Sequence, residues 1–319
     1  MPEGQEAAVV GVDVGGTKVA AGVIDGVELS NRVEHPTDRT NAAELLEGIE
    51  IAIREVARTA GPPAAVGIGL PSQIDFASGT VVASANIPLE GVAVGKDLSA
   101  IFDCPVYVDN DANCAALAEA RVAGVHHLVM LTLGTGVGGG VIIDGRIFRG
   151  ATGLGAELGH VVIQEDGPEC PGTCPNHGCL EALCSGTALE REATSFATGN
   201  PDSALGRVFA QEGRITGPEV VRLAHEGDAG AAELFEQLAR HLGAGMAGVI
   251  NTFEPQLLAI GGGLSRAGDL FMEAAEREAR ARALPALSER VAISLARAGA
   301  DAGVIGAGAL AAYELAQAV

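Results

Sequence analysis

The pattern of apolar positions along the chain is that of a protein in which strands and helices alternate. Short runs rich in β-branched residues predict strands at residues 8–14, 19–24, 64–70, 80–83, 106–108, 128–133, 141–143 and 257–260. Residues 42–60 instead carry leucine, isoleucine and valine at helical spacing, and Gly61-Pro62-Pro63 ends that helix. Further helices are predicted at residues 112–123, 229–249, 268–283 and 301–318. The alternation predicts an α/β fold.

Two segments of the chain share one pattern and indicate an internal duplication. Residues 12–26 align with residues 131–145 without a gap, so that Val23-Ile-Asp-Gly26 falls on Ile142-Ile-Asp-Gly145. In each copy an apolar run enters a turn of glycine and threonine, and a second apolar run leaves it. This is the signature of a β-hairpin, with Asp25 and Asp144 in the turn that ends its second strand.

The turns inside the two copies predict phosphate binding. Backbone N–H groups of glycine-rich turns can close on an anion, and Thr17, Lys18 and Thr135 can add donors. A single copy is better explained as a tight turn, whereas two copies at matched positions favour a shared ligand. The residues concerned are Asp13, Gly15, Gly16, Thr17 and Lys18 in the first turn and Gly134, Thr135, Gly136 and Gly138 in the second.

Two further glycine patterns bear on nucleotide binding. Gly134-x-Gly136-x-x-Gly139 satisfies the dinucleotide fingerprint, but that motif requires a helix directly after its glycines. Here an apolar strand follows, so a nicotinamide cofactor is disfavoured. The cluster Gly261, Gly262 and Gly263 lies between a predicted strand and a predicted helix. Such a turn suits the adenosine half of a nucleotide, and a turn without a ligand is an equally ordinary interpretation.

Composition narrows the class of protein. The 319 residues exceed the size at which a single hydrophobic core usually stops growing, so two domains are expected. The net charge of −21 repels polyphosphate backbones, which makes nucleic acid an unfavourable partner. The amino terminus lacks the pattern of a signal peptide, and no window is long and apolar enough to cross a membrane. A cytoplasmic protein is therefore expected.

Cysteines gather in one segment and indicate a metal site. In a reducing compartment, six cysteines favour a metal or free thiols over disulfides. The set His160, Cys170, Cys174 and Cys179 offers one imidazole and three thiols, which suits tetrahedral Zn²⁺. Cys184 is a spare thiol, and His177 is a possible substitute ligand. The alternative is a cluster of reduced thiols without a metal.

Six motifs in order along the chain resemble those of the ROK family of sugar kinases. They are Asp13-x-Gly15-Gly16-Thr17-Lys18, Asn110-Asp111-x-Asn113, Gly134-Thr-Gly-x-Gly138-Gly139-Gly140, Glu157-x-Gly159-His160, Cys174-x-x-x-Gly178-Cys179-x-Glu181 and Gly261-Gly262-Gly263. The resemblance implies the duplicated actin-like ATPase fold, of the ribonuclease H-like class, with two domains and a cleft between them. It implies a small domain at residues 1–115, completed by a helix at 301–319, and a large domain at residues 116–300.

The resemblance also implies an activity and its residues. The reaction is transfer of the γ-phosphoryl group of ATP to the 6-hydroxyl of a hexose, foremost glucose, with Asp111 as general base. Asp111 follows a predicted strand and opens a helix, so a helix cap is its structural alternative. Asp13 is expected to hold Mg²⁺. The residues expected to bind the sugar are Asn86, Asn110, Asp111, Glu157, His160 and Glu181.

Several alternatives remain open at this point. Mannose, fructose, N-acetylglucosamine or N-acetylmannosamine could replace glucose, and polyphosphate could replace ATP. A sugar-sensing regulator of the same family is the alternative of another class, but only about seven residues precede the first predicted strand. The family pattern expects a cysteine where Gly172 stands, so Cys170 replaces it as a ligand. Alanine-rich helices after residue 229 offer apolar surface for a homodimer or higher homo-oligomer.

Overall fold

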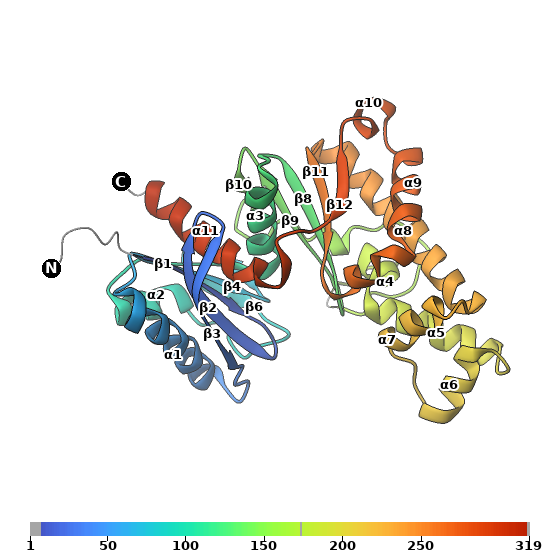
Figure 1. Ribbon diagram of the computed structural model, residues 1–319, viewed down its shortest axis with the longest axis horizontal. Helices are drawn as coiled ribbons and strands as arrows, with labels where there is room; N and C mark the ends of the chain where they lie inside the picture. The colour runs from blue at the N-terminus through green and yellow to red at the C-terminus, as the bar shows by residue number, and fades with distance from the viewer. Residues whose placement is uncertain (1–7, 173, 318–319) are drawn as a thin grey trace. The chain divides into compact units, whose positions relative to one another are not determined.

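The computed structural model describes residues 8–172 and 174–317, and the chain divides into two compact units (Figure 1). The first unit comprises Met1–Leu128, Gly140–Ala156 and Ala296–Val319, and the second comprises Val129–Gly139 and Glu157–Leu295. The whole of the helix that begins at Asp111 lies in the first unit.

A five-stranded sheet forms the centre of the first unit, with the strand order β3-β2-β1-β4-β7. Its strands are β1 (Val9–Val14), β2 (Lys18–Asp25), β3 (Glu28–Pro36), β4 (Ala65–Leu70) and β7 (Val106–Asn110). The β1–β2 pair is the antiparallel hairpin predicted from the sequence, and β4 and β7 add to it in parallel. Parallel strands end at one edge of a sheet, so β1, β4 and β7 bring their carboxyl ends together.

Helices cover both faces of this sheet (Figure 1). Alternate residues of a strand point to opposite faces. On one face Val10 and Val12 form the core with the apolar side of α1 (Ala42–Ala60). On the other face Gly11 and Gly67 admit α11 (Ala302–Gln317) so closely that a Cβ atom at Gly67 would lie 1.8 Å from the carbonyl oxygen of Ala307. The final helix therefore packs directly on the amino-terminal sheet.

The remaining elements of the first unit support its strand ends. The hairpin of β5 (Gln73–Asp75) and β6 (Thr80–Ala83) follows β4, and α2 (Val94–Phe102) precedes β7. Helix α3 (Asp111–Ala123) begins directly at the end of β7 and packs along α11. The strand β7 thus delivers its last residues to the amino terminus of a helix.

A second five-stranded sheet has the order β10-β9-β8-β11-β12, which repeats the arrangement of the first. Its strands are β8 (Leu128–Leu133), β9 (Val137–Ile143), β10 (Arg146–Ile147), β11 (Leu257–Gly261) and β12 (Ala292–Leu295). In the turn after β9, Asp144 and Gly145 have φ values of 53° and 74°, the pattern of a type I′ hairpin turn. The predicted duplication is confirmed.

Helices make up most of the second unit. They are the 3₁₀ helix η1 (Leu158–His160), α4 (Leu180–Cys184), α5 (Gly186–Gly199), α6 (Ala204–Glu212), α7 (Gly217–His225), α8 (Ala229–Phe253), α9 (Met272–Arg282) and α10 (Pro285–Ser288). The helix predicted over residues 268–283 is wrong at its start. A 3₁₀ helix, η2 (Gly263–Leu270), comes first, and Phe271 with φ of −140° separates it from α9.

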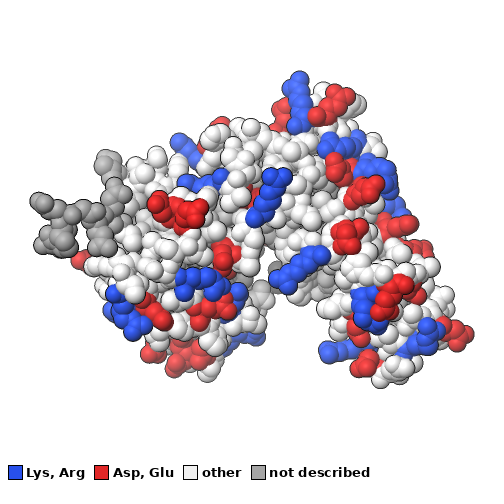
Figure 2. Space-filling view, viewed as in Figure 1, with Lys and Arg blue, Asp and Glu red and all other residues white. Residues whose placement is uncertain are grey.

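The surface carries charges of both signs. On the face drawn in Figure 2, lysine and arginine lie interspersed with aspartate and glutamate, although acidic residues prevail in the whole chain at a net charge of −21. Across residues 8–172 and 174–317, no helix combines the length and the apolar character that a membrane span requires.

Candidate active site

The first glycine turn has its carbonyl oxygens bound by a neighbouring segment. Thr37 Oγ1 donates to the carbonyl of Gly15 (2.8 Å), and the Thr37 N–H donates to that of Thr17 (3.0 Å). The Arg39 guanidinium reaches the carbonyl of Gly16 at 3.4 Å. Because the N–H and C=O of a trans peptide point in opposite directions, the N–H groups of residues 16–18 point away from the 37–39 segment. This is the arrangement that lets a turn accept an anion.

The second turn is held in the same way, although by a different part of the chain. The Gly186 N–H donates to the carbonyl of Gly134 (2.7 Å), and Thr187 Oγ1 donates to that of Thr135 (2.8 Å). Gly186 and Thr187 begin α5, so a helix start in the second unit fixes the turn. The two turns therefore share a principle of construction as well as a sequence pattern.

Two charged residues flank the first turn. Lys18 begins β2, and its ammonium lies 3.2 Å from the carboxylate of Glu34. The two side chains are 42% and 40% exposed. Ion pairs that water reaches contribute little stability, so Lys18 can exchange this partner for a phosphate. Asp13 lies near the carboxyl end of β1, and burial raises its pKa, an effect that the nearby Lys18 charge opposes. A carboxylate so placed favours a cation nearby.

Asn110 and Asp111 form the junction between β7 and α3. The Asn110 side chain caps the helix: its Oδ1 accepts from the N–H groups of Ala112 (2.9 Å) and Asn113 (3.3 Å). The cap that the sequence offered as an alternative role for Asp111 thus belongs to Asn110. Asp111 is the first residue of the helix, half-buried, and its Oδ1 accepts from the N–H of Ala112 at 2.8 Å. A carboxylate at this end of a parallel strand lies where open α/β sheets bind ligands.

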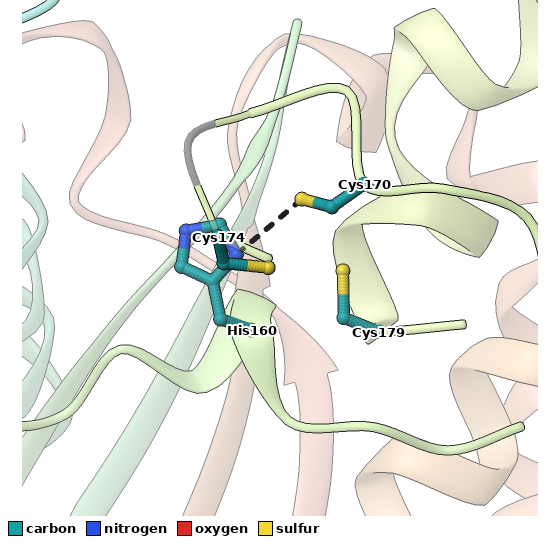
Figure 3. Close-up of side chains that lie close together, drawn as sticks. All are labelled: His160, Cys170, Cys174 and Cys179. Carbon is teal, nitrogen blue, oxygen red and sulfur yellow. Dashed lines mark hydrogen bonds between the residues drawn. The ribbon is translucent and has the colours of Figure 1, made fainter. Parts of the chain in front are cut away.

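Four predicted metal ligands lie together in the second unit. One ligand atom from each of His160, Cys170, Cys174 and Cys179 lies within 4.8 Å of every other. Figure 3 shows the three sulfur atoms and the imidazole converging on one point. The Nδ1 atom of His160 is the nitrogen on this side, 3.7 Å from Cys170 Sγ. His177 is exposed and stands outside the group, and Cys184 is buried elsewhere.

This group fits zinc in both chemistry and dimensions. Tetrahedral coordination at a Zn–S distance of about 2.3 Å separates neighbouring sulfurs by about 3.8 Å, and the four ligand atoms lie within 4.8 Å of one another, which is compact enough for one ion. Burial, more than any other cause, raises the pKa of Cys170 well above its ordinary value. Without a cation, Cys170 is therefore a neutral thiol in a cluster of three. Four protein ligands leave no open position, so a bound zinc would be structural.

Glu181 connects the cysteine loop with the second glycine turn. The side chain is 9% exposed, and its Oε2 accepts from the Val137 N–H at 2.8 Å. Its Oε1 accepts from the Cys170 thiol at 3.6 Å. Gly136 and Gly172 leave it room, since a Cβ atom at either would lie within 2.5 Å of a Glu181 oxygen. A side chain at position 172, where the family pattern expects cysteine, would collide with this carboxylate.

If the second turn holds the phosphates of ATP, as the family resemblance implies, replacing Glu181 by Gln should raise the KM for ATP about tenfold. Glutamine can still accept from the Val137 N–H, but the turn is loosened because a charge-assisted hydrogen bond of roughly 1.5–3 kcal/mol is replaced by a neutral one of roughly 0.5–1.5 kcal/mol. Steady-state kinetics with both substrates measures the effect. Glu157→Gln is the matched control, because Glu157 is exposed and has no part in the turn, so its KM for ATP should stay constant. An unchanged KM for ATP in Glu181→Gln would contradict this role of the carboxylate.

The other residues expected to bind ligands lie as follows. Asn86 and Glu157 are exposed, and His160, at the end of η1, is half-buried. Gly261 ends β11, and Gly262 has φ of 84° with its Cα so close to the carbonyl of Leu133 that a side chain would collide. Within unit 2 the third glycine cluster thus meets the strand that leads into the second glycine turn.

Sequence reasoning missed the residues that support the site. Thr37, Arg39, Gly186 and Thr187 bind the carbonyls of the two turns, and Arg149 pairs with Asp109 beside the Asn110–Asp111 junction. Each acts over a long separation in the chain. The Gly-Thr pair at 186–187 has the same composition as the turns, but nothing in its spacing indicates its partner.

Comparisons with known proteins show the family of the chain. A model of the ROK family matches residues 9–314. The glucokinase of Streptomyces coelicolor is 36% identical over 311 residues, which cover 95% of this chain and 96% of that one. The ROK hexokinase of Thermus thermophilus has a TM-score of 0.83 at 35% identity, covering 97% and 99%. A ROK glucokinase from Streptomyces griseus, solved with glucose and AMPPNP, has a TM-score of 0.79 at 32% identity, covering 96% and 100%.

Proposed function

Because the chain belongs to the ROK family, we propose that it is an ATP-dependent glucokinase. The reaction transfers the γ-phosphoryl group to the 6-hydroxyl of glucose. The observation that carries the proposal is the Asn110–Asp111 junction at the carboxyl end of β7, in a chain similar over nearly its whole length to a glucokinase solved with glucose and a nucleotide.

Asp111 acts as the general base in this proposal. Phosphoryl transfer requires that the attacking hydroxyl lose its proton, and a positioned carboxylate can accept it. Asn110 holds the junction through its cap, with its amide donating to the carbonyl of Ser72 at 3.2 Å. The sugar hydroxyls are bound by amide, carboxylate and imidazole groups, which leave costly unpaired atoms when the wrong epimer enters. We assign this role to Asn86, Asn110, Asp111, Glu157, His160 and Glu181.

The glycine turns hold the nucleotide in this proposal. N–H groups of residues 16–18 and the Lys18 ammonium bind phosphate oxygens, as do those of the second turn, and the 261–263 cluster serves the adenosine half. Mg²⁺, bound with the nucleotide and held by Asp13, neutralises charge on the phosphates. If Nδ1 of His160 ligates zinc, the other ring N–H is left to donate to a sugar hydroxyl. The reduced cysteines agree with a cytoplasmic enzyme.

Sugar-dependent release of ADP tests this function. A coupled assay across glucose, mannose, fructose, N-acetylglucosamine and N-acetylmannosamine, with ATP or polyphosphate as donor, should give the highest kcat/KM with glucose and ATP. A higher value for another sugar would reassign the acceptor, and a higher value with polyphosphate would reassign the donor. The absence of sugar-dependent turnover would contradict a kinase and favour a sugar-sensing regulator.

A further inference from the structure

A buried ion pair lies directly beside the proposed general base. Arg149 Nε donates to Asp109 Oδ2 at 2.6 Å, with the side chains 18% and 3% exposed. The guanidinium also stacks on the ring of Phe76, 3.5 Å from its centroid, and lies 3.4 Å from the Glu314 carboxylate. Arg149 therefore joins β7, the β5–β6 hairpin and α11 within the first unit.

Asp109 connects Arg149 to the segment that carries the proposed base. Its Oδ1 accepts from the N–H of Asn110 and from the Asn113 amide, each at 2.8 Å. These two bonds fix the last peptide of β7 and the first turn of α3, with Asp111 between them. Arg149 holds the other oxygen of the same carboxylate, so the orientation of Asp109 depends on it.

Several carboxylates lie near Asp109, so the positive charge of Arg149 is needed to compensate them. The thiol of Cys114 is buried in the first turn of α3, and burial is the main cause that raises its pKa. The charges of Asp109, Asp13 and Asp111 raise this pKa further, whereas the charge of Arg149 lowers it. The carboxylates of Asp109, Asp13, Asp111 and Glu314 thus share this region, and Arg149 is the cation that pairs with Asp109. Removing one partner of a buried pair leaves an uncompensated charge, which is far more costly than removing both.

We propose that Arg149 is a positioning residue for phosphoryl transfer, which acts through Asp109 to hold Asn110 and Asp111 in register. The inference rests on the proposed function, since it assigns Asp111 as the base. Arg149 binds no substrate in this scheme. Its loss rotates the Asp109 carboxylate and displaces the junction, and a displacement of about 1 Å in a catalytic group can cost about a hundredfold in rate.

Arg149→Met should lower kcat for glucose about 10- to 100-fold while the KM for ATP changes less than about threefold, because the phosphate turns are untouched. Steady-state kinetics with both substrates separates the two constants. Arg146→Met is the matched control: Arg146 lies three residues earlier, is exposed, and faces the Tyr313 ring at 5.8 Å. It should keep kcat within about twofold. A kcat for Arg149→Met equal to that of Arg146→Met would overturn the inference.

The double variant Asp109→Asn/Arg149→Met distinguishes positioning from simple packing. It removes both charges, yet the amide oxygen that replaces a carboxylate oxygen at position 109 can still accept from Asn110 and Asn113. We expect it to turn over about tenfold faster than Arg149→Met, because removing both charges leaves no uncompensated charge in the buried site. A double variant as slow as Arg149→Met or slower would overturn the inference, and the comparison holds even where Arg149→Met alone unfolds, because zero activity is then the value to exceed.

The outcomes for the two proposals are distinct. An active wild-type kinase with an undisturbed Arg149→Met overturns the inference alone. A wild-type chain with no sugar-dependent turnover contradicts the proposed function, and the inference with it. Where another hexose proves to be the acceptor, the same variants are measured with that sugar, and the expected ratios are unchanged.

Discussion

Replacing Asp111 by Asn should lower kcat for sugar phosphorylation by about 10²- to 10⁴-fold, the usual contribution of a general base. Asparagine has the same shape and keeps an oxygen that can accept from the Ala112 N–H, now at 2.8 Å from Asp111 Oδ1. It cannot take a proton at neutral pH. The change therefore removes the chemistry of the side chain and leaves its local hydrogen bond, and the coupled ADP assay measures the result.

The fold should survive this substitution. The helix cap belongs to Asn110 and is not altered, so the melting temperature and the affinity for ATP should match those of the wild type. Equal melting with lost turnover separates catalysis from stability. Turnover within tenfold of the wild type would show that another group takes the proton, and Asp111 would lose its assignment.

The duplicated hairpins could be predicted from the sequence because their information is local. The apolar runs around residues 12–26 and 131–145 fix both strands of each hairpin, and Asp144-Gly145 fixes a turn that needs positive φ at both positions. The same holds for α1, whose apolar spacing and terminal Gly61 give the bounds that the structure has. The alternation of elements predicted an α/β fold, and the family motifs then added the actin-like ATPase arrangement, which periodicity alone does not give.

Contacts between distant segments could not be predicted. Nothing near Arg149 in the sequence indicates that it meets Asp109, and nothing near Glu181 indicates that it binds Val137. The start of α9 was also misjudged, since a 3₁₀ helix and α-helix have similar apolar spacing and only the backbone at Phe271 separates them. Residues proposed to contact ligands are therefore easier to predict from the sequence than residues that hold those side chains in place.

These supporting contacts explain how one sequence pattern forms a similar turn at two places in the chain. Both glycine turns have their carbonyls bound from behind, by Thr37 and Arg39 in one case and by Gly186 and Thr187 in the other. The turn supplies the peptide groups, and the outside segment orients them. In the second turn that segment follows Cys179 within a few residues, which links the second glycine turn with the cysteine cluster.

We expect one zinc ion per chain. Its removal should lower the free energy of unfolding more than any substitution discussed above. Native mass spectrometry of protein made in zinc-replete cells should show the ion, and a chelator or Cys174→Ser should abolish it. A structural zinc contributes several kcal/mol to folding, so the unfolding midpoint should fall by about 10 °C or more. Because Glu181 contacts both Cys170 and Val137, the KM for ATP should rise in the same protein.

Cys184→Ala is the control for the zinc prediction, because it removes a buried cysteine that is not one of the predicted ligands. Cys184 is buried close in sequence to the cluster but lies outside the ligand group, with its thiol 3.9 Å from the carbonyl of Leu238. This variant should keep the zinc, whereas Cys170→Ser should lose it, even though Cys170 departs from the family spacing. Loss of zinc in Cys184→Ala but not in Cys170→Ser would show that Cys184, not Cys170, is the fourth ligand. A wild-type mass without zinc would leave reduced thiols as the explanation, and the loop would then depend on hydrogen bonds such as that from the Gly172 N–H to Cys170 Sγ at 3.4 Å.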